Sequence, residues 1–442
     1  MMDGILRLND YDVWHNTAAG AHDPSMMWDP VTQKYYSYCT DIYGPPLGLP
    51  NRIGIPVRSS EDLFHFKYEG TVLSDAAVAQ GRDNGKYPET VNFWAPYVEY
   101  VHGEYRMYYS ATRAFGSSES RIWLAIAKDP LGPFENRGVV ADTWGTDDTY
   151  PNAIDPHIIW EGNKCYLVYG SFFGGIYIKK LDAESGLAED GNPKNLGICI
   201  SRKNPRPRID GPEGAAVIYI KETGFYYLFQ SYGWLGNNYD IRVARSENVT
   251  GPYVDRRGVS VVEHSMGEKI AGSYRFQASR PFAGHDRKNW EWGGFRGPGH
   301  GVPFYDPVRQ AYFFVHHIRD GAAVNSYRDE YEGRVSFSKH YMMIRPMFFV
   351  DGWPVFGPEP FTGESLEPVS PGEAAGRWEI ITLDDRDNEQ KLSVECDLDS
   401  DSSYLNNGRV YRCWDFENQK YTMAVTGFDD SGVAYWGKFM YI

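Results

Sequence analysis

The side chains with the greatest chemical potential lie in short motifs that are far apart in the 442-residue chain. Asp23 and Asp155 each precede a proline, Glu213 stands between a proline and a glycine, and His300 lies in a glycine-rich run. Three carboxylates brought to one place would repel one another unless a water, a cation or a function compensated. The question is therefore whether the fold brings them together.

The plain alternative is that these motifs are ordinary turns, because Asp-Pro is a common turn starter. Asp29, Asp129 and Asp306 begin such turns within hairpins or strand connections. Asp23 and Asp155 differ, since each precedes the first strand of a repeated unit. This difference in position favours a role beyond the turn.

Five segments supply that repeat, and each reads as a β-hairpin with a polar turn and an aromatic-rich, alternating second strand. They cover residues 28–38, 99–110, 160–170, 220–231 and 305–316. Four are followed by a third strand and a turn, and residues 334–343 would complete the fifth. Nothing in the chain shows the 3.6-residue apolar stripe of a long helix. A unit of this kind is typical of a β-propeller blade.

The repeat places five residues near the blade starts: Asp23, Trp94, Asp155, Glu213 and His300. The innermost strands of a propeller face its axis, so these positions should converge. We therefore predict an all-β protein with a five-bladed β-propeller over residues 1–361. A linker at 362–376 would lead to a small β-barrel or sandwich domain at 377–442. The loops at 75–92 and 262–296 should line one face.

Composition excludes several function classes. Lys and Arg number 44 and Asp and Glu number 59, so the net charge is −15, which argues against nucleic acid and a membrane surface as partners. No apolar run is long enough for a membrane-spanning helix. Five widely spaced cysteines form no zinc pattern, although Cys396 and Cys413 could pair. The sequence does not indicate the oligomeric state.

At these motifs the chain resembles glycoside hydrolase family 43, the five-bladed propeller glycosidases, and most of all its α-L-arabinanases. Residues 152–182, residues 213–233 and the Gly-Pro-Gly-His run at 297–300 are similar to the family's, and all motifs occur in the family's order. The similarity covers about residues 10–360. The segment after it resembles the small β-barrel domain of some arabinanases.

The resemblance implies an inverting mechanism with Asp23 as the general base and Glu213 as the general acid. Asp155 would raise the pKa of Glu213 and help to orient the sugar. The acid is ambiguous, because alignment on the strand Val217-Ile218-Tyr219 selects Glu213, whereas alignment on Gly-Pro selects Asp210. The family usually has Pro-Tyr where this chain has Ala215-Ala216.

The resemblance also assigns binding residues. Trp94 would stack on a sugar at the pocket floor, and Phe115 would form a wall. Asn152 and Ser171 would bond sugar hydroxyls, and His300 would bind a hydrated calcium ion on the axis. A core role remains the alternative for Trp94 and His300. Most of the other aromatic residues, which make up 16% of the chain, should pack between sheets.

The function expected from the resemblance is hydrolysis of α-1,5-L-arabinofuranosidic bonds in arabinan or arabino-oligosaccharides, in endo or exo mode. The alternatives are an α-L-arabinofuranosidase or β-xylosidase on short oligosaccharides, and a non-catalytic, glycan-binding propeller. The opening residues MMDGILRLND show no secretory signal, so a cytoplasmic location is expected, or secretion if a leader has been removed.

Overall fold

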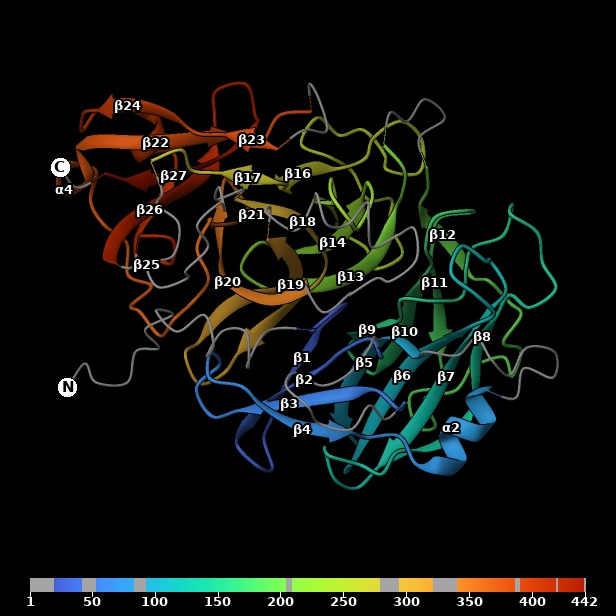
Figure 1. Ribbon diagram of the computed structural model, residues 1–442. Coiled ribbons are helices and arrows are strands. Elements are labelled where there is room, and N and C mark those ends of the chain that lie inside the picture. Colours follow the sequence, from blue (N-terminus) through green and yellow to red (C-terminus); the bar gives the residue numbers. More distant parts are fainter. Residues whose placement is uncertain are drawn as a thin grey trace, which may run out of the picture.

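The chain forms six β-sheets and only three short helices among its described residues (Figure 1). The computed structural model describes residues 20–41, 53–82, 93–203, 209–278, 294–320, 340–385, 390–418 and 420–440. The predicted all-β class is confirmed. The predicted features at 1–19, 83–92, 279–293 and 334–339 lie outside the described residues.

Four sheets contain four antiparallel strands each, taken in chain order. The first contains β1 (Ser25–Asp29), β2 (Lys34–Tyr38), β3 (Pro56–Ser60) and β4 (Lys67–Thr71). The second contains β5 (Phe93–Val101), β6 (Glu104–Thr112), β7 (Ser120–Ala127) and β8 (Glu135–Asp142). The third contains β9 (His157–Glu161), β10 (Lys164–Tyr169), β11 (Ile176–Leu181) and β12 (Ile198–Ser201). The fourth contains β13 (Glu213–Ile220), β14 (Phe225–Tyr232), β15 (Asp240–Ser246) and β16 (Glu268–Ala271).

The fifth sheet has six strands in the order β21-β20-β19-β18-β17-β23. Its members are β17 (Tyr274–Arg275), β18 (Phe295–Asp306), β19 (Ala311–Asp320), β20 (His340–Val350), β21 (Trp353–Phe356) and β23 (Lys391–Leu392). The sixth sheet contains β22 (Gly376–Thr382), β24 (Val394–Leu398), β25 (Arg409–Asp415), β26 (Lys420–Phe428) and β27 (Ala434–Phe439). β23 pairs in parallel with β17, so the C-terminal part of the chain extends the fifth sheet by one strand.

An aromatic pair marks the same place in the first hairpin of four sheets, just before the turn. The pairs are Trp28 with Tyr35, Tyr100 with Tyr105, Tyr219 with Tyr226, and Tyr305 with Tyr312, with ring centroids 4.7 to 5.1 Å apart. Directly opposed aromatic residues stabilise antiparallel strands. These pairs show that the repeat read from the sequence is a repeat of structure.

A ring is formed by β1, β5, β9, β13 and β18, the first strands of the hairpins in the first five sheets (Figure 1). β1 lies against β5 and β18, and β13 lies against β9 and β18. Between β5 and β9, the indole of Trp160 donates a 2.8 Å hydrogen bond to Glu99, and the rings of Tyr97 and His157 are 4.6 Å apart. The start of each first strand is therefore brought close to the others, although these segments are far apart in the chain.

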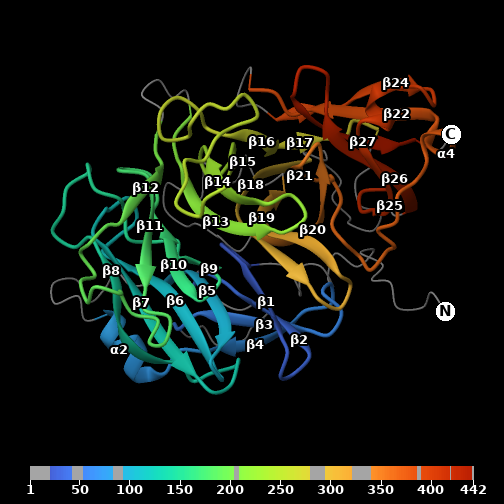
Figure 2. The same cartoon turned by 180° about the vertical axis from the view of Figure 1, so that it is seen from behind.

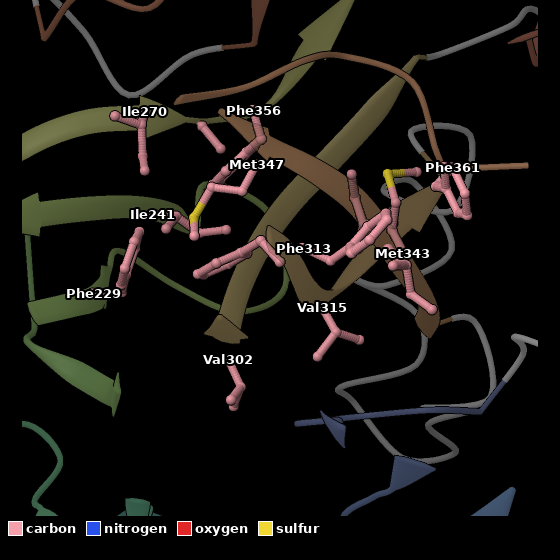
Figure 3. Packing of buried hydrophobic residues seen from close by; sticks show 14 of the residues in the cluster. Phe229, Ile241, Ile270, Val302, Phe313, Val315, Met343, Met347, Phe356 and Phe361 are labelled. Atoms are coloured by element: carbon pink, nitrogen blue, oxygen red, sulfur yellow. The ribbon is translucent and has the colours of Figure 1, made fainter. Parts of the chain in front are cut away.

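Apolar side chains fill the space between sheets. Figure 3 shows part of the largest cluster, with Phe229 of the fourth sheet facing Phe313, Val315 and Met347 of the fifth. The C-terminal strands lie beside β17 and β21, on the opposite side of the molecule from β8 in both ribbon views (Figures 1 and 2). Burial of this surface holds the sheets in place.

The structure differs from the sequence-based expectation in several details. A helix, α2 (Asp75–Arg82), stands in the segment expected as a loop, and α4 (Pro371–Ala374) interrupts the expected linker. A third helix is α5 (Ser403–Asn406). The C-terminal five-stranded sheet is open, because no pairing joins its outer strands β24 and β25 in the described residues. All five cysteines are free thiols, so Cys396 and Cys413 do not pair.

Candidate active site

One backbone feature recurs near the start of β1, β5, β9 and β13 and midway along β18. Asp23, Ala95, Asp155, Gly214 and His300 have φ between 44° and 59°, the left-handed region. That region costs a non-glycine residue roughly 1–3 kcal/mol and is concentrated at functional sites. Asp23, Asp155 and His300 thus occupy equivalent positions of three sheets, whereas Trp94 and Glu213, also expected there, each stand one residue before that position.

The backbone N–H of these residues is held by a side chain of the preceding sheet. The bonds run from Ala95 to Thr40 Oγ1 (2.8 Å), from Asp155 to Ser110 Oγ (3.1 Å), from His300 to Ser231 Oγ (2.8 Å) and from Asp23 to His317 Nδ1 (3.3 Å). Each bond ties one sheet to the next around the ring. The carboxylates at these positions are therefore held by a rigid scaffold.

The fifth residue of this series, Gly214, differs from the others because it has no side chain. Its N–H donates to Asp155 Oδ2 at 3.1 Å, and a Cβ at this position would lie 3.0 Å from the backbone and ring of His300. Only glycine fits such a close approach. Glu213 therefore stands one residue before the position that Asp23 and Asp155 occupy, rather than at it.

The carboxylate of Asp23 is buried among one hydroxyl and three imidazole side chains. His22 Nδ1 lies 2.8 Å from Oδ2, Thr40 Oγ1 donates to Oδ2 at 2.5 Å, and the Nδ1 atoms of His300 and His317 lie 3.2 and 3.3 Å from Oδ1. Burial alone would raise the pKa of Asp23, but His22, His300 and hydrogen bonding outweigh it and hold this pKa well below its usual range. Asp23 is thus ionised and able to accept a proton.

The pKa of Glu213 is raised, in contrast to that of Asp23. Ser171 Oγ donates to its Oε2 at 2.8 Å, and the hydroxyl of Tyr239 donates to its Oε1. Its deep position raises the pKa of Glu213, as does the charge of Asp23, whereas the two hydroxyls lower it; the result is about 7. Glu213 can therefore carry a proton near neutral pH, as a general acid must.

The pKa of Asp155 responds to the charges of both Asp23 and Glu213. Burial, the charge of Glu213 and the charge of Asp23 raise the pKa of Asp155 well above its usual range. A carboxyl that stays protonated beside two others reduces their mutual repulsion. Three carboxyl groups thus share one site with unequal proton affinities.

Asp210, the other candidate for the acid, lies in a different environment. Its side chain is 66% exposed and pairs with the ammonium of Lys203. Glu213, in contrast, is enclosed by Ser171 and Tyr239. The geometry favours Glu213 for the acid role.

Three aromatic side chains contact one another in a row that begins at Trp94, next to Ala95. The ring of Trp94 lies 6.2 Å from that of Phe115, and Phe115 lies 5.9 Å from Trp234, each in an edge-on arrangement. Phe115 is 55% exposed, which is unusual for a large apolar side chain in this protein. Most other Tyr and Phe residues are buried between sheets, as predicted. The three rings offer apolar surfaces to a sugar.

Asn152 and Ser171 have different surroundings. Asn152 is buried, and no described group donates a hydrogen bond to its Oδ1. A buried acceptor of this kind is satisfied when a ligand hydroxyl reaches it. Ser171, expected to bond the sugar, donates instead to Glu213.

His300 meets the basic requirement of a cation ligand. Burial lowers the pKa of His300, so its imidazole is neutral, and Asp23 and Asp155 lie 3.2 and 3.9 Å from its Nδ1. Neutral imidazole and carboxylate oxygens fit a divalent cation, and the oxygens suit a hard one.

Sequence reasoning missed four residues of the site. His22 and His317 contact Asp23, Tyr239 contacts Glu213, and Trp234 contacts Phe115. His22 adjoins the Asp-Pro motif, and that adjacency was the available signal. The neighbouring His316 accepts a 2.9 Å hydrogen bond from Arg345 in the core.

Comparison with known proteins places this arrangement among glycosidases. The profile of the family "Glycosyl hydrolases family 43" matches residues 17–354. The extracellular endo-α-(1→5)-L-arabinanase of Thermotoga petrophila is 29% identical over 480 residues, covering 95% of this chain and 93% of the relative. The extracellular endo-α-(1→5)-L-arabinanase 2 of Bacillus subtilis is 27% identical, covering 80% and 81%. The crystal structure of the Thermotoga petrophila enzyme superposes with a TM-score of 0.75 at 25% identity, covering 96% of this chain and 99% of that one.

These relatives correct one expectation. Both curated relatives are named extracellular, which points to secretion rather than to the cytoplasmic location expected from the opening residues. An opening segment is weak evidence on location, because it identifies only the signals that it contains.

Proposed function

Because the chain belongs to the glycosyl hydrolases of family 43 and is therefore a glycoside hydrolase, we propose that it cleaves α-1,5-L-arabinofuranosidic bonds of arabinan with inversion. Three carboxyl groups of unequal proton affinity at the meeting point of the first strands carry this proposal. The names of the relatives that cover most of the chain supply the substrate.

The mechanism assigns one carboxyl group to each proton transfer. Asp23, held ionised by its histidine neighbours, takes a proton from the attacking water. Glu213, protonated near neutral pH, gives its proton to the leaving glycosidic oxygen. Burial and the charge of Asp23, rather than Asp155, raise the pKa of Glu213. Asp155, which keeps its own proton, would help to orient the sugar. The bond from the sugar carbon to the leaving oxygen breaks as the bond to water forms, so no covalent intermediate is needed.

The two main carboxyl groups come from different sheets. Asp23 precedes β1 and Glu213 begins β13, and both strands lie against β18, which separates them in the ring. The two carboxylates have no common hydrogen-bond partner among the described residues. An inverting glycosidase needs its carboxyl groups about 6.5–9.5 Å apart, with room for a water between them.

Substrate contacts follow from the exposed surfaces around these groups. Trp94 and Phe115 would stack on sugar rings, and Asn152 would accept a hydrogen bond from a sugar hydroxyl. Ser171 acts on the substrate through Glu213 in this scheme. A non-catalytic glycan-binding role is disfavoured, because binding alone gives no reason to hold three carboxyl groups in such unequal states.

The proposal also includes a five-bladed propeller, its domain boundaries and a calcium site. The ring of five first strands supports a five-bladed β-propeller over residues 1–361, joined by 362–376 to a C-terminal part at 377–442. A calcium ion with waters would be held by His300 as its single protein ligand. When bound, it supplies positive charge that offsets the nearby carboxylates.

Product analysis tests the function. Linear 1,5-arabinan, aryl α-L-arabinofuranosides and aryl β-xylosides should be incubated separately with the protein. Arabino-oligosaccharides or arabinose from arabinan support the proposal, and mixed short oligomers indicate endo action. Turnover of the xyloside alone would favour a β-xylosidase, and no turnover of any substrate would contradict the proposal.

A further inference from the structure

Both carboxylate oxygens of Glu213 are held by hydroxyl groups. Ser171 Oγ donates to Oε2 at 2.8 Å, and Tyr239 donates to Oε1. These donors come from different sheets, since Ser171 follows β10 and Tyr239 precedes β15. The carboxylate is therefore fixed in orientation from two sides.

The ring of Tyr239 is itself locked in place. The side chain is buried, and its ring stacks on His317 with a centroid distance of 5.6 Å and an interplanar angle of 12°. The ring also contacts Gly299, where a Cβ would lie 1.8 Å from Tyr239 Cδ2. The phenol hydroxyl therefore has one direction in which to point, toward Glu213.

The residue after Tyr239 connects this arrangement to the C-terminal part of the chain. Arg242 donates to Asp240 through Nε at 2.9 Å and Nη2 at 2.8 Å. The same guanidinium donates to Asp385 through Nη1 at 2.8 Å and Nη2 at 2.7 Å. Paired bonds between a guanidinium and a carboxylate are geometrically specific.

The charges around Arg242 balance. The side chains of Arg242 and Asp240 are nearly inaccessible, at 1% and 3% exposure, and Lys269 lies 3.8 Å from both Asp240 and Asp385. Two cations thus face two carboxylates. The side chain of Asp385 is 45% exposed, but its removal leaves the buried Arg242 and Lys269 with only Asp240 to balance them.

We propose that Tyr239 is a positioning residue for the general acid Glu213, and that Asp385 supports Tyr239 through Arg242 and Asp240. This inference rests on the proposed role of Glu213. It gives the C-terminal part a function in catalysis: Asp385, between β22 and β23, orders the start of β15 where Tyr239 stands.

The physical consequence lies in the proton-transfer step. As the proton passes from Glu213 to the leaving oxygen, negative charge develops on the carboxylate. The donated bonds from Tyr239 and Ser171 strengthen as that charge grows, while both hydroxyls keep their own protons. Loss of the Tyr239 hydroxyl therefore weakens the acid and frees its orientation.

Leaving-group dependence tests this step. Tyr239→Phe keeps the stacked ring and removes only the hydroxyl. Its kcat should fall about 10- to 100-fold on arabinan, whose leaving alcohol needs protonation. On an aryl arabinotrioside with an acidic phenol, which leaves without an acid, the loss should stay below about threefold. Because both rates come from one preparation, any unfolded fraction cancels from their ratio.

A second pair of variants tests the support from the C-terminal part. Asp385→Asn should lower kcat on arabinan relative to kcat on the aryl arabinotrioside by about three- to tenfold. The substitution should add little in the Tyr239→Phe background, because both residues act through the carboxylate of Glu213. The matched controls are Tyr312→Phe, which loses an exposed bond to Glu222, and Glu395→Gln, which loses an exposed pair with Arg377. Neither control should change the ratio.

The outcomes separate this inference from the proposed function. A wild-type protein inactive on every sugar substrate would contradict the function itself. With an active wild type, equal losses on arabinan and on the aryl substrate in Tyr239→Phe would reduce Tyr239 to a structural residue and overturn the inference. Additive effects of Asp385→Asn and Tyr239→Phe would overturn the link to the C-terminal part.

Discussion

Asp23 and Asp155 occupy the same position in two different sheets, each with a left-handed backbone, at φ of 46° and 59°. Their carboxyl groups nevertheless have opposite proton affinities. Histidine side chains surround Asp23 and keep it ionised, whereas Asp155 faces Glu213 and Asp23 and keeps its proton. Two carboxyl groups at the same backbone position thus differ in pKa, because their neighbouring side chains differ.

Substitution of the acid distinguishes Glu213 from Asp210. Glu213→Gln should lower kcat on arabinan by about 10²- to 10⁴-fold, because a general acid contributes a factor of this size. Asp210→Asn should stay within about twofold of the wild type, since this carboxylate is exposed and pairs only with Lys203. Steady-state kinetics on arabinan checks both. The reverse pattern, with Asp210→Asn inactive and Glu213→Gln active, would move the acid to Asp210.

The pKa of Glu213 predicts the alkaline limb of the pH profile. Burial raises this pKa to about 7, and the acid works only when protonated. Therefore kcat/KM on arabinan should fall as pH rises through about 7, approaching a tenfold loss per pH unit. An aryl substrate with an acidic phenol should show a weaker decline. A profile that stays flat to pH 9 on arabinan would contradict the assignment of Glu213.

Calcium binding at His300 predicts a stabilisation that needs no activity measurement. Chelator-treated protein should gain about 3 °C in Tm when calcium is added in large excess over its dissociation constant. His300→Gln should abolish the gain while the protein stays folded, as judged by circular dichroism. Magnesium serves as a control for ionic strength. A gain that persists in His300→Gln would place the ion elsewhere.

A buried lysine of the C-terminal sheet should be essential for stability. Lys438 Nζ lies 3.1 Å from Glu359, 3.1 Å from Asp415 and 2.5 Å from Glu417, all buried. Lys438→Met leaves three carboxylates uncompensated and should lower the free energy of unfolding by about 3–5 kcal/mol. Urea-induced unfolding measures this loss, with the exposed Lys67→Met as control.

The stability lost in Lys438→Met should depend on pH, because a carboxyl group of the same cluster titrates near neutrality. Burial, against the charge of Lys438, raises the pKa of Glu359 to about 7 in the folded protein. A raised folded pKa means stability that is present at low pH and is lost as pH rises through about 7. The cost of Lys438→Met should therefore be larger at pH 8 than at pH 5. An equal cost at both values would contradict the interpretation.

The sequence predicted those parts of the site that depend on local repeats. Alternating aromatic strands and Asp-Pro motifs located the five hairpins and placed Asp23 and Asp155 at equivalent starts. Periodicity also identified most Tyr and Phe residues as packing between sheets. These features depend on residues close together in the chain, so a single sequence is enough to predict them.

Contacts between distant segments could not be predicted in this way. Tyr239 immediately precedes β15 and His317 lies in β19, and only the fold brings them to the carboxylates. Asp385 is more than 140 residues from Arg242, and nothing local marks the pair. Helix α2 was missed because its eight residues show too short an apolar stripe to distinguish it from a loop.

The stereochemistry of the first product tests the central claim most directly. Linear 1,5-arabinan is incubated with the protein in an NMR tube, and the anomeric proton signals of the new reducing ends are followed before mutarotation. If Asp23 activates water while Glu213 protonates the leaving oxygen, the β-anomer forms first from the α-linked substrate. Initial formation of the α-anomer would contradict the account, because it requires a covalent intermediate that this arrangement does not provide.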